Sequence, residues 1–284
     1  VSGDFRGARR LQERNIEMWR QIGPSLSGEM WSLTQLAWVS IELGDFKAAE
    51  GILPALREWA QGRSGLIGLF TEWAEAVLLR FRGELAQALP RLRALQLQAV
   101  ARQPGDLQSL LATCVVADAA IEHGDYELTE AALNEIAAPV DQNVADQYVH
   151  AWAHYLWCEL RLRQGRLDEA RQVLAKAHTR DESLAALARA YLSRAEGKLA
   201  AAEKDWPATI AAFETAARLE AEMGRKWVRA QVLREWAEAH LGRGDAGDVG
   251  RARELLREAH SLFEGMNVPH YADLVRDRLQ ALPA

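Results

Sequence analysis

The sequence contains little cysteine. Cys114 and Cys158 are the two cysteines among its 284 residues, too few for a disulfide framework, so we predict a cytoplasmic protein in a reducing compartment. Apolar residues never continue for the roughly 20 positions that a membrane-spanning helix needs, and we expect no signal peptide. We therefore expect no contact with a membrane.

Basic residues are not in excess either. Lys and Arg total 34 against 40 Asp and Glu, a net charge of −6, which argues against direct nucleic-acid binding. A phosphate loop ending in Gly-Lys-Ser or Gly-Lys-Thr is missing, and so is the Gly-x-Ser-x-Gly pattern of a nucleophile elbow. We predict no enzyme activity, no catalytic residue and no cofactor.

A turn of the type Gly44-Asp45 recurs instead, at intervals of about 40 residues. Its glycine supplies the left-handed conformation that ends one helix, and its aspartate caps the next helix. A long period built from two helices and a turn indicates a helical solenoid. The copies begin at Gly3, Gly44, Gly83, Gly124 and Gly165, at Lys204 in place of glycine, and at Gly244 or Gly247.

Positions at fixed distances from the turn keep their character. A small residue, which lets two helices approach closely, stands seven positions before each turn: Ala37, Ala76, Ala117, Cys158, Gly197 and Ala237. A large apolar residue stands nine positions after it: Leu53, Leu92, Leu133, Leu174, Phe213 and Leu256. We predict that these two sets pack the helices together.

The repeats divide the whole chain. We predict one all-α solenoid domain over 1–284, with a truncated repeat at 1–23, repeats at 24–62, 63–103, 104–140, 141–180, 181–224 and 225–266, and a capping helix at 267–284. Because the chain opens inside a repeat, we expect a fragment of a larger protein.

The order of residues around the Gly44 turn is a small residue, Gly-Asp-aromatic, alanine and then a large apolar residue. This pattern resembles the tetratricopeptide repeat, with a period of about 40 in place of 34. The closing segment, from Ala252-Arg253-Glu254 to Ala272, is similar to the last repeat in the C-terminal arms of bacterial signal-transduction ATPases, such as the maltose-responsive transcription activators. The resemblance implies a right-handed superhelix of antiparallel helix pairs. It also implies a binding and oligomerisation module of a bacterial signalling or transcriptional regulator. A free-standing scaffold or adaptor is the alternative.

In the resembling family, first helices line a concave groove through residues 13, 10 and 6 positions before the turn glycine. Here these residues are aromatic or apolar in the N-terminal half and charged in the C-terminal half. The partner we expect is a protein or peptide segment, or a small-molecule effector. Core packing is the alternative role of the tryptophans. The predicted groove residues are Trp31, Trp38, Phe70, Trp73, Trp152, Tyr155, Tyr191 and Arg194.

His150, His154 and Cys158 follow one another at intervals of four on one expected helix. This spacing places metal-ligand types along one helix face. Cys158, however, occupies the small packing position, so we predict a structural role and no metal. An enzyme, either a helical-toroid transferase or a metal-dependent hydrolase using both histidines, is the third functional hypothesis.

Overall fold

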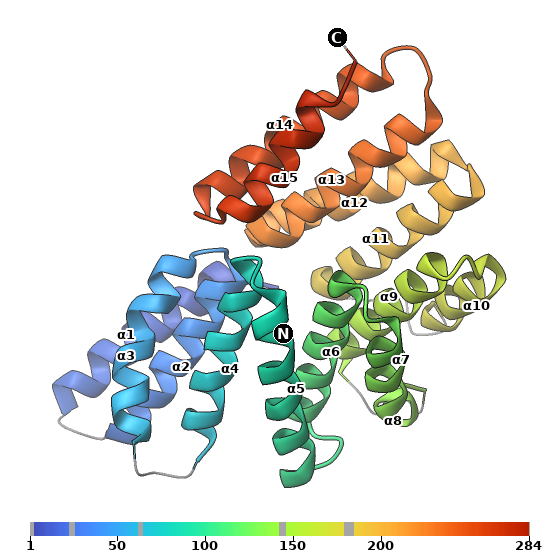
Figure 1. Cartoon of the computed structure of the whole chain (residues 1–284). Helices are drawn as coiled ribbons and strands as arrows, with labels where there is room; N and C mark the ends of the chain where they lie inside the picture. The colour runs from blue at the N-terminus through green and yellow to red at the C-terminus, as the bar shows by residue number, and fades with distance from the viewer. Residues whose placement is uncertain (1–2, 23–25, 62–64, 142–145, 179–184, 284) are drawn as a thin grey trace.

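The computed structural model describes residues 3–22, 26–61, 65–141, 146–178 and 185–283. In this part of the chain all regular structure is helical, and the helices follow one another as a curved stack (Figure 1). They are α1 (Phe5–Ile22), α2 (Leu26–Glu42), α3 (Phe46–Ala60), α4 (Leu66–Phe81), α5 (Leu85–Arg102), α6 (Leu107–His123), α7 (Tyr126–Glu135), α8 (Ala137–Asp141), α9 (Gln147–Arg163), α10 (Leu167–Ala177), α11 (Ala186–Glu203), α12 (Trp206–Met223), α13 (Lys226–Arg243), α14 (Asp248–Gly265) and α15 (Pro269–Gln280). None of these helices is long and apolar enough to cross a membrane.

Successive helices pack in pairs, such as α2 with α3 and α11 with α12. The arrangement is an all-α solenoid of tetratricopeptide-like helix pairs, as the repeats predict. The exact limits of the repeats stay a prediction, and the limit drawn at 140 falls inside the short helix α8.

The turns have the conformation that the sequence predicts. Gly44 and Gly124 adopt φ of +70° and +86°, and Lys204 takes the same left-handed conformation at φ 62° in the copy that lacks glycine. The Asp45 carboxylate accepts a hydrogen bond of 3.2 Å from the backbone N–H of Ala48. Each such cap satisfies a donor that the start of a helix leaves unpaired.

The predicted packing positions are confirmed. All six small residues seven positions before the turns are buried, and so are all six large apolar residues nine positions after them. At Gly197 an added Cβ would lie 3.0 Å from the ring of Phe213, so α11 and α12 are as close as a glycine allows. We call these twelve positions the seam.

The C-terminal helices return to the N-terminal half of the molecule. In Figure 1, α12 to α15 lie above the turn ends of α2 to α5. The ring of Trp227 packs against Phe81 at 4.4 Å and against Tyr271 at 4.6 Å, between ring centroids. Phe46 and Phe263 complete the cluster. We call these five residues the aromatic clasp; it closes the curved stack on itself.

Candidate functional site

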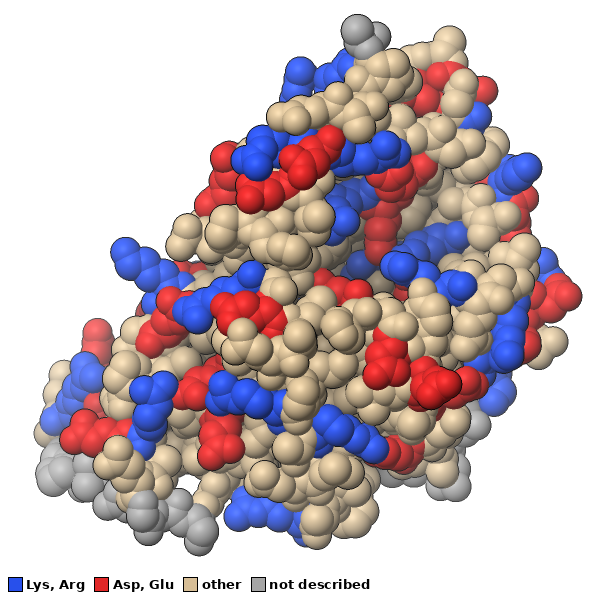
Figure 2. Space-filling view, in the orientation of Figure 1, with Lys and Arg blue, Asp and Glu red and all other residues tan. Residues whose placement is uncertain are grey.

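The stack surrounds a central cavity of about 920 Å³ that opens to solvent on one face of the molecule. Its wall consists mainly of the first helices of the pairs, α2, α4, α6, α9, α11 and α13, and α15 completes it. Figure 2 shows the molecule hollowed below its C-terminal helices, with acidic and basic side chains inside the hollow. The resemblance implies a groove lined by these first helices, and the clasp joins the two ends of the stack beside this cavity.

Six of the eight predicted groove residues line the cavity: Trp38, Trp73, Trp152, Tyr155, Tyr191 and Arg194. The other two, Trp31 and Phe70, do not. They pack edge to face, with ring centroids 6.0 Å apart, and Trp31 is 41% exposed. Both residues lie near the starts of α2 and α4, far along each helix from the turn end that faces the cavity.

The cavity is placed asymmetrically along the helices. On α2, α4 and α6 the position 13 residues before the turn glycine lies outside the wall, whereas on α9, α11 and α13 it lies in the wall. The position six residues before the turn lines the cavity in all six helices. The N-terminal helices therefore contribute only their turn ends, because the clasp closes the stack over those ends.

One side of the cavity is aromatic. Trp38 and Trp73 pack against each other at 4.6 Å between centroids and are only half-buried. Trp152 stacks with Tyr148 at 5.4 Å and with Tyr191 at 5.7 Å, and all three are buried. Trp152 is therefore packed in the core, whereas Trp38 and Trp73 leave part of their apolar surface facing the cavity.

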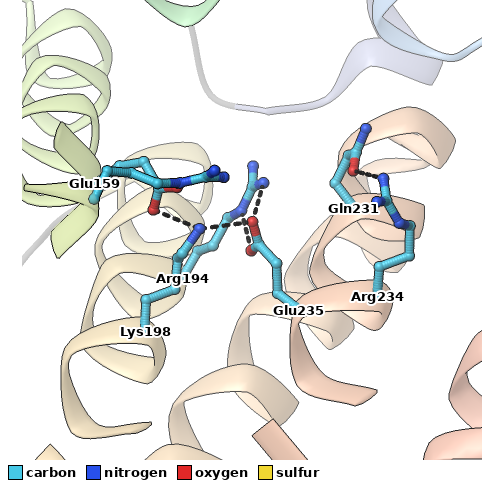
Figure 3. A network of polar contacts seen from close by, with 7 residues as sticks. Glu159, Arg194, Lys198, Gln231, Arg234 and Glu235 are labelled. Carbon is cyan, nitrogen blue, oxygen red and sulfur yellow. Dashed lines mark hydrogen bonds and ion pairs between the residues drawn. The ribbon is translucent and has the colours of Figure 1, made fainter. Parts of the chain in front are cut away.

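The wall also carries a network of ion pairs (Figure 3), which adjoins the aromatic residues because the Arg194 guanidinium lies 4.7 Å from the centroid of the Tyr155 ring. Glu235 accepts two hydrogen bonds from the Arg194 guanidinium, at 2.7 and 2.9 Å. Lys198 lies between Glu235, at 2.9 Å, and Glu159. Burial raises the pKa of Glu235, but the nearby Arg194 and Lys198 outweigh it and hold that pKa below its usual range. These two basic and two acidic side chains are therefore already paired with one another.

A second buried group of charges joins the two ends of the molecule. Arg225, on the turn before α13, donates to Glu42 at 2.9 Å and to Glu220 at 3.1 Å. It also donates to the hydroxyl of Tyr191 at 3.0 Å. Burial, opposed by Arg225, raises the pKa of Glu220 to about 7. One guanidinium thus serves two carboxylates, and Glu42 lies 183 positions away in the chain.

A third group lies beside the clasp. Arg80 forms ion pairs with Asp118 at 3.1 Å and with Glu122 at 2.8 Å. The hydroxyl of Tyr271 donates to Glu122 at 2.6 Å. This contact ties α15 to α6, so the last helix, expected as a cap, also completes the cavity wall.

The histidine pattern on α9 is buried. His154 donates from Nδ1 to the backbone carbonyl of His150 at 2.8 Å, and the Cys158 thiol, whose pKa burial raises to about 12, lies in the seam. Within the described ranges no three His, Cys, Asp or Glu side chains converge to hold a metal ion.

Sequence reasoning missed Arg225, Trp227, Tyr148 and Tyr271 as cavity residues. They lie outside the three groove positions, and Trp227 and Tyr271 contact partners that are far away in the chain. The sequence does carry one indication of the clasp. An aromatic residue, Phe46, stands two positions after the turn glycine Gly44, and it is part of the clasp.

Comparison with known proteins gives a fold and no family. No protein-family model matches the sequence, and no curated protein matches it either. Among solved structures, BtubC (BKLC) from P. vanneervenii is similar at a TM-score of 0.54 and 17% identity, over 77% of this chain and 92% of that chain. A tetratricopeptide repeat protein from Parabacteroides merdae is similar at a TM-score of 0.41 and 17% identity, over 87% of this chain and 98% of that chain. At this identity the first likeness concerns the fold alone.

Proposed function

We propose that this protein is a binding module that holds a small organic effector in its central cavity. The observation that carries the proposal is the central cavity itself, whose wall carries both half-buried tryptophans and partly buried ion pairs. Concave sites with an apolar lining and a few placed polar groups are typical of small-molecule binding. Its volume of about 920 Å³ lies within the usual range for such sites.

Closure favours a small molecule over a long partner segment. A peptide that ran along an open solenoid groove would cross the place where Trp227 meets Phe46 and Phe81. It would also have to part the buried contact of Arg225 with Glu42. A small effector requires no such opening once it is inside.

We further propose that the module belongs to a larger bacterial regulator. Binding of the effector favours the closed clasp and so controls how the regulator assembles into oligomers. The supporting observations are the repeat pattern and the closing segment from 252 to 272. Sequencing the complete gene tests this part. A nucleotide-binding or DNA-binding domain in the same polypeptide is expected; a gene that encodes only the solenoid contradicts it and favours the adaptor.

Ligand screening tests the module itself. We expect some sugars, nucleotides or organic acids and their neutral amides to raise the melting temperature and to change tryptophan fluorescence saturably. The variant Ala239→Trp fills the cavity from its wall and should abolish both signals. Ala101→Trp, at an exposed position of α5, should leave them unchanged. Equal loss in both variants, or no saturable response to any small molecule, would count against the proposal.

A further inference from the structure

Among the described residues, every lysine and arginine of the cavity wall except one contacts a carboxylate. Arg80 contacts Asp118 and Glu122, Arg163 contacts Glu159, Arg194 contacts Glu235, Lys198 contacts Glu159 and Glu235, Arg225 contacts Glu42 and Glu220, and Arg278 contacts Glu238. The exception is Arg234 on α13.

Arg234 has a neutral partner instead. Its Nη1 donates to the amide oxygen of Gln231, one turn earlier on α13, at 2.8 Å. Figure 3 shows this pair beside the network of Arg194, Lys198 and Glu235 but separate from it. A guanidinium has five N–H donors. With one of them on Gln231, Arg234 keeps donors for a bound group, and the side chain is only half-buried.

The charge of Arg234 determines which group fits. Water inside the cavity can accept hydrogen bonds from the guanidinium, but it cannot neutralise the charge. Charge interactions are stronger in an enclosed, partly apolar site than in bulk water. A carboxylate offers two oxygens in the plane that matches the guanidinium fork, so it can accept two parallel bonds.

The rest of the cavity indicates what the carboxylate is attached to. Each of the other cations described in the wall already contacts a carboxylate, so a second anionic group would have to compete with that carboxylate. The half-buried rings of Trp38 and Trp73 leave flat apolar surface in the same cavity. An aryl or alkyl body would cover that surface and gain from its burial.

We propose that the cavity binds a small organic monocarboxylate. Its carboxylate would contact Arg234, and its apolar body would contact the rings of Trp38 and Trp73. The proposal rests on the proposed function and names its ligand class. Gln231 acts as a positioning residue, because it orients the guanidinium without carrying charge.

The test uses a matched pair of probes, 2-naphthoate and its neutral analogue 2-naphthamide, titrated into the whole chain by isothermal calorimetry. We expect 2-naphthoate to bind at least tenfold more tightly than 2-naphthamide. Arg234→Met should remove this preference, and Arg234→Lys should restore part of it. Arg218→Met, which removes an exposed arginine of α12 that lies outside the cavity wall and pairs with Glu222 at 2.7 Å, should change naphthoate affinity less than twofold.

The outcomes separate the two proposals. If both probes bind equally and Arg234→Met changes nothing, the cavity binds small molecules but the carboxylate assignment is overturned. If neither probe binds and no other small molecule does, the proposed function itself fails. Melting temperatures of the Arg234 variants serve as the folding check, and Arg234→Lys keeps the test valid should Arg234→Met fail to fold.

Discussion

The seam and the clasp hold this molecule together in different ways. Seam contacts recur once per repeat between neighbouring helices, and each uses a small residue against a larger one, as Gly197 does against Phe213. Clasp contacts occur once and join helices far apart in the chain, as Trp227 joins Phe81 and Tyr271. The seam therefore stabilises the fold repeat by repeat. The clasp determines whether the two ends of the stack meet around the cavity.

The largest effect should come from Arg225→Met. This substitution leaves Glu42 and Glu220 buried without their common guanidinium, and removing one partner of a buried ion pair typically costs about 3–5 kcal/mol. We expect the chain to escape most of that cost by opening the clasp, so the radius of gyration in small-angle scattering should rise while the helices remain. Arg218→Met breaks an exposed pair with Glu222 on neighbouring α12 and should cost less than about 1 kcal/mol. An unchanged radius in Arg225→Met would show that the charge group does not hold the clasp.

Ala117→Leu should affect the seam instead. Ala117 is fully buried, and overpacking at such a site costs about 1–3 kcal/mol. We expect a lower free energy of unfolding in chemical denaturation with no change in the radius of gyration. The exposed Ala101 gives the matched control, since Ala101→Leu should be close to neutral. A larger radius of gyration in Ala117→Leu would contradict this difference, because it would show that a seam contact also holds the stack closed.

These two kinds of contact also differ in how far the sequence predicts them. Ala117, Cys158 and Gly197 could be recognised because a seam position repeats at a fixed distance from a turn. Nothing local indicates that Arg225 meets Glu42, 183 positions earlier, because that contact depends on the curvature accumulated over all intervening repeats. The same curvature explains why Trp38 lines the cavity and Trp31 does not, although both lie at predicted groove positions.

The smallest predicted effect is a pH dependence of stability through Glu220, a buried partner of Arg225. Burial, opposed by Arg225, raises the pKa of Glu220 to about 7 from an ordinary 4.5, so between these values the folded state binds more protons than the unfolded state. The stability contribution of this group is therefore fully present below 4.5 and is lost as pH rises through 7.

We expect the free energy of unfolding to fall by roughly 1–2 kcal/mol between about pH 5.5 and 8 through this group. Glu220→Gln should remove the part of the pH dependence that Glu220 causes. Because both chains contain the same histidines, the difference between their pH profiles isolates the contribution of Glu220. Parallel pH profiles for the two chains would contradict the assignment.

A distance measurement across the clasp tests the central claim that the solenoid is closed on itself. Spin labels would be placed at Lys47 and Glu264, two exposed positions on α3 and α14 near the facing turns, after the two buried cysteines are replaced by alanine. Closure predicts one narrow, short distance in pulsed electron paramagnetic resonance, which becomes broad and long in Arg225→Met. A broad, long distribution in the chain that keeps Arg225 would show an open groove and contradict the account.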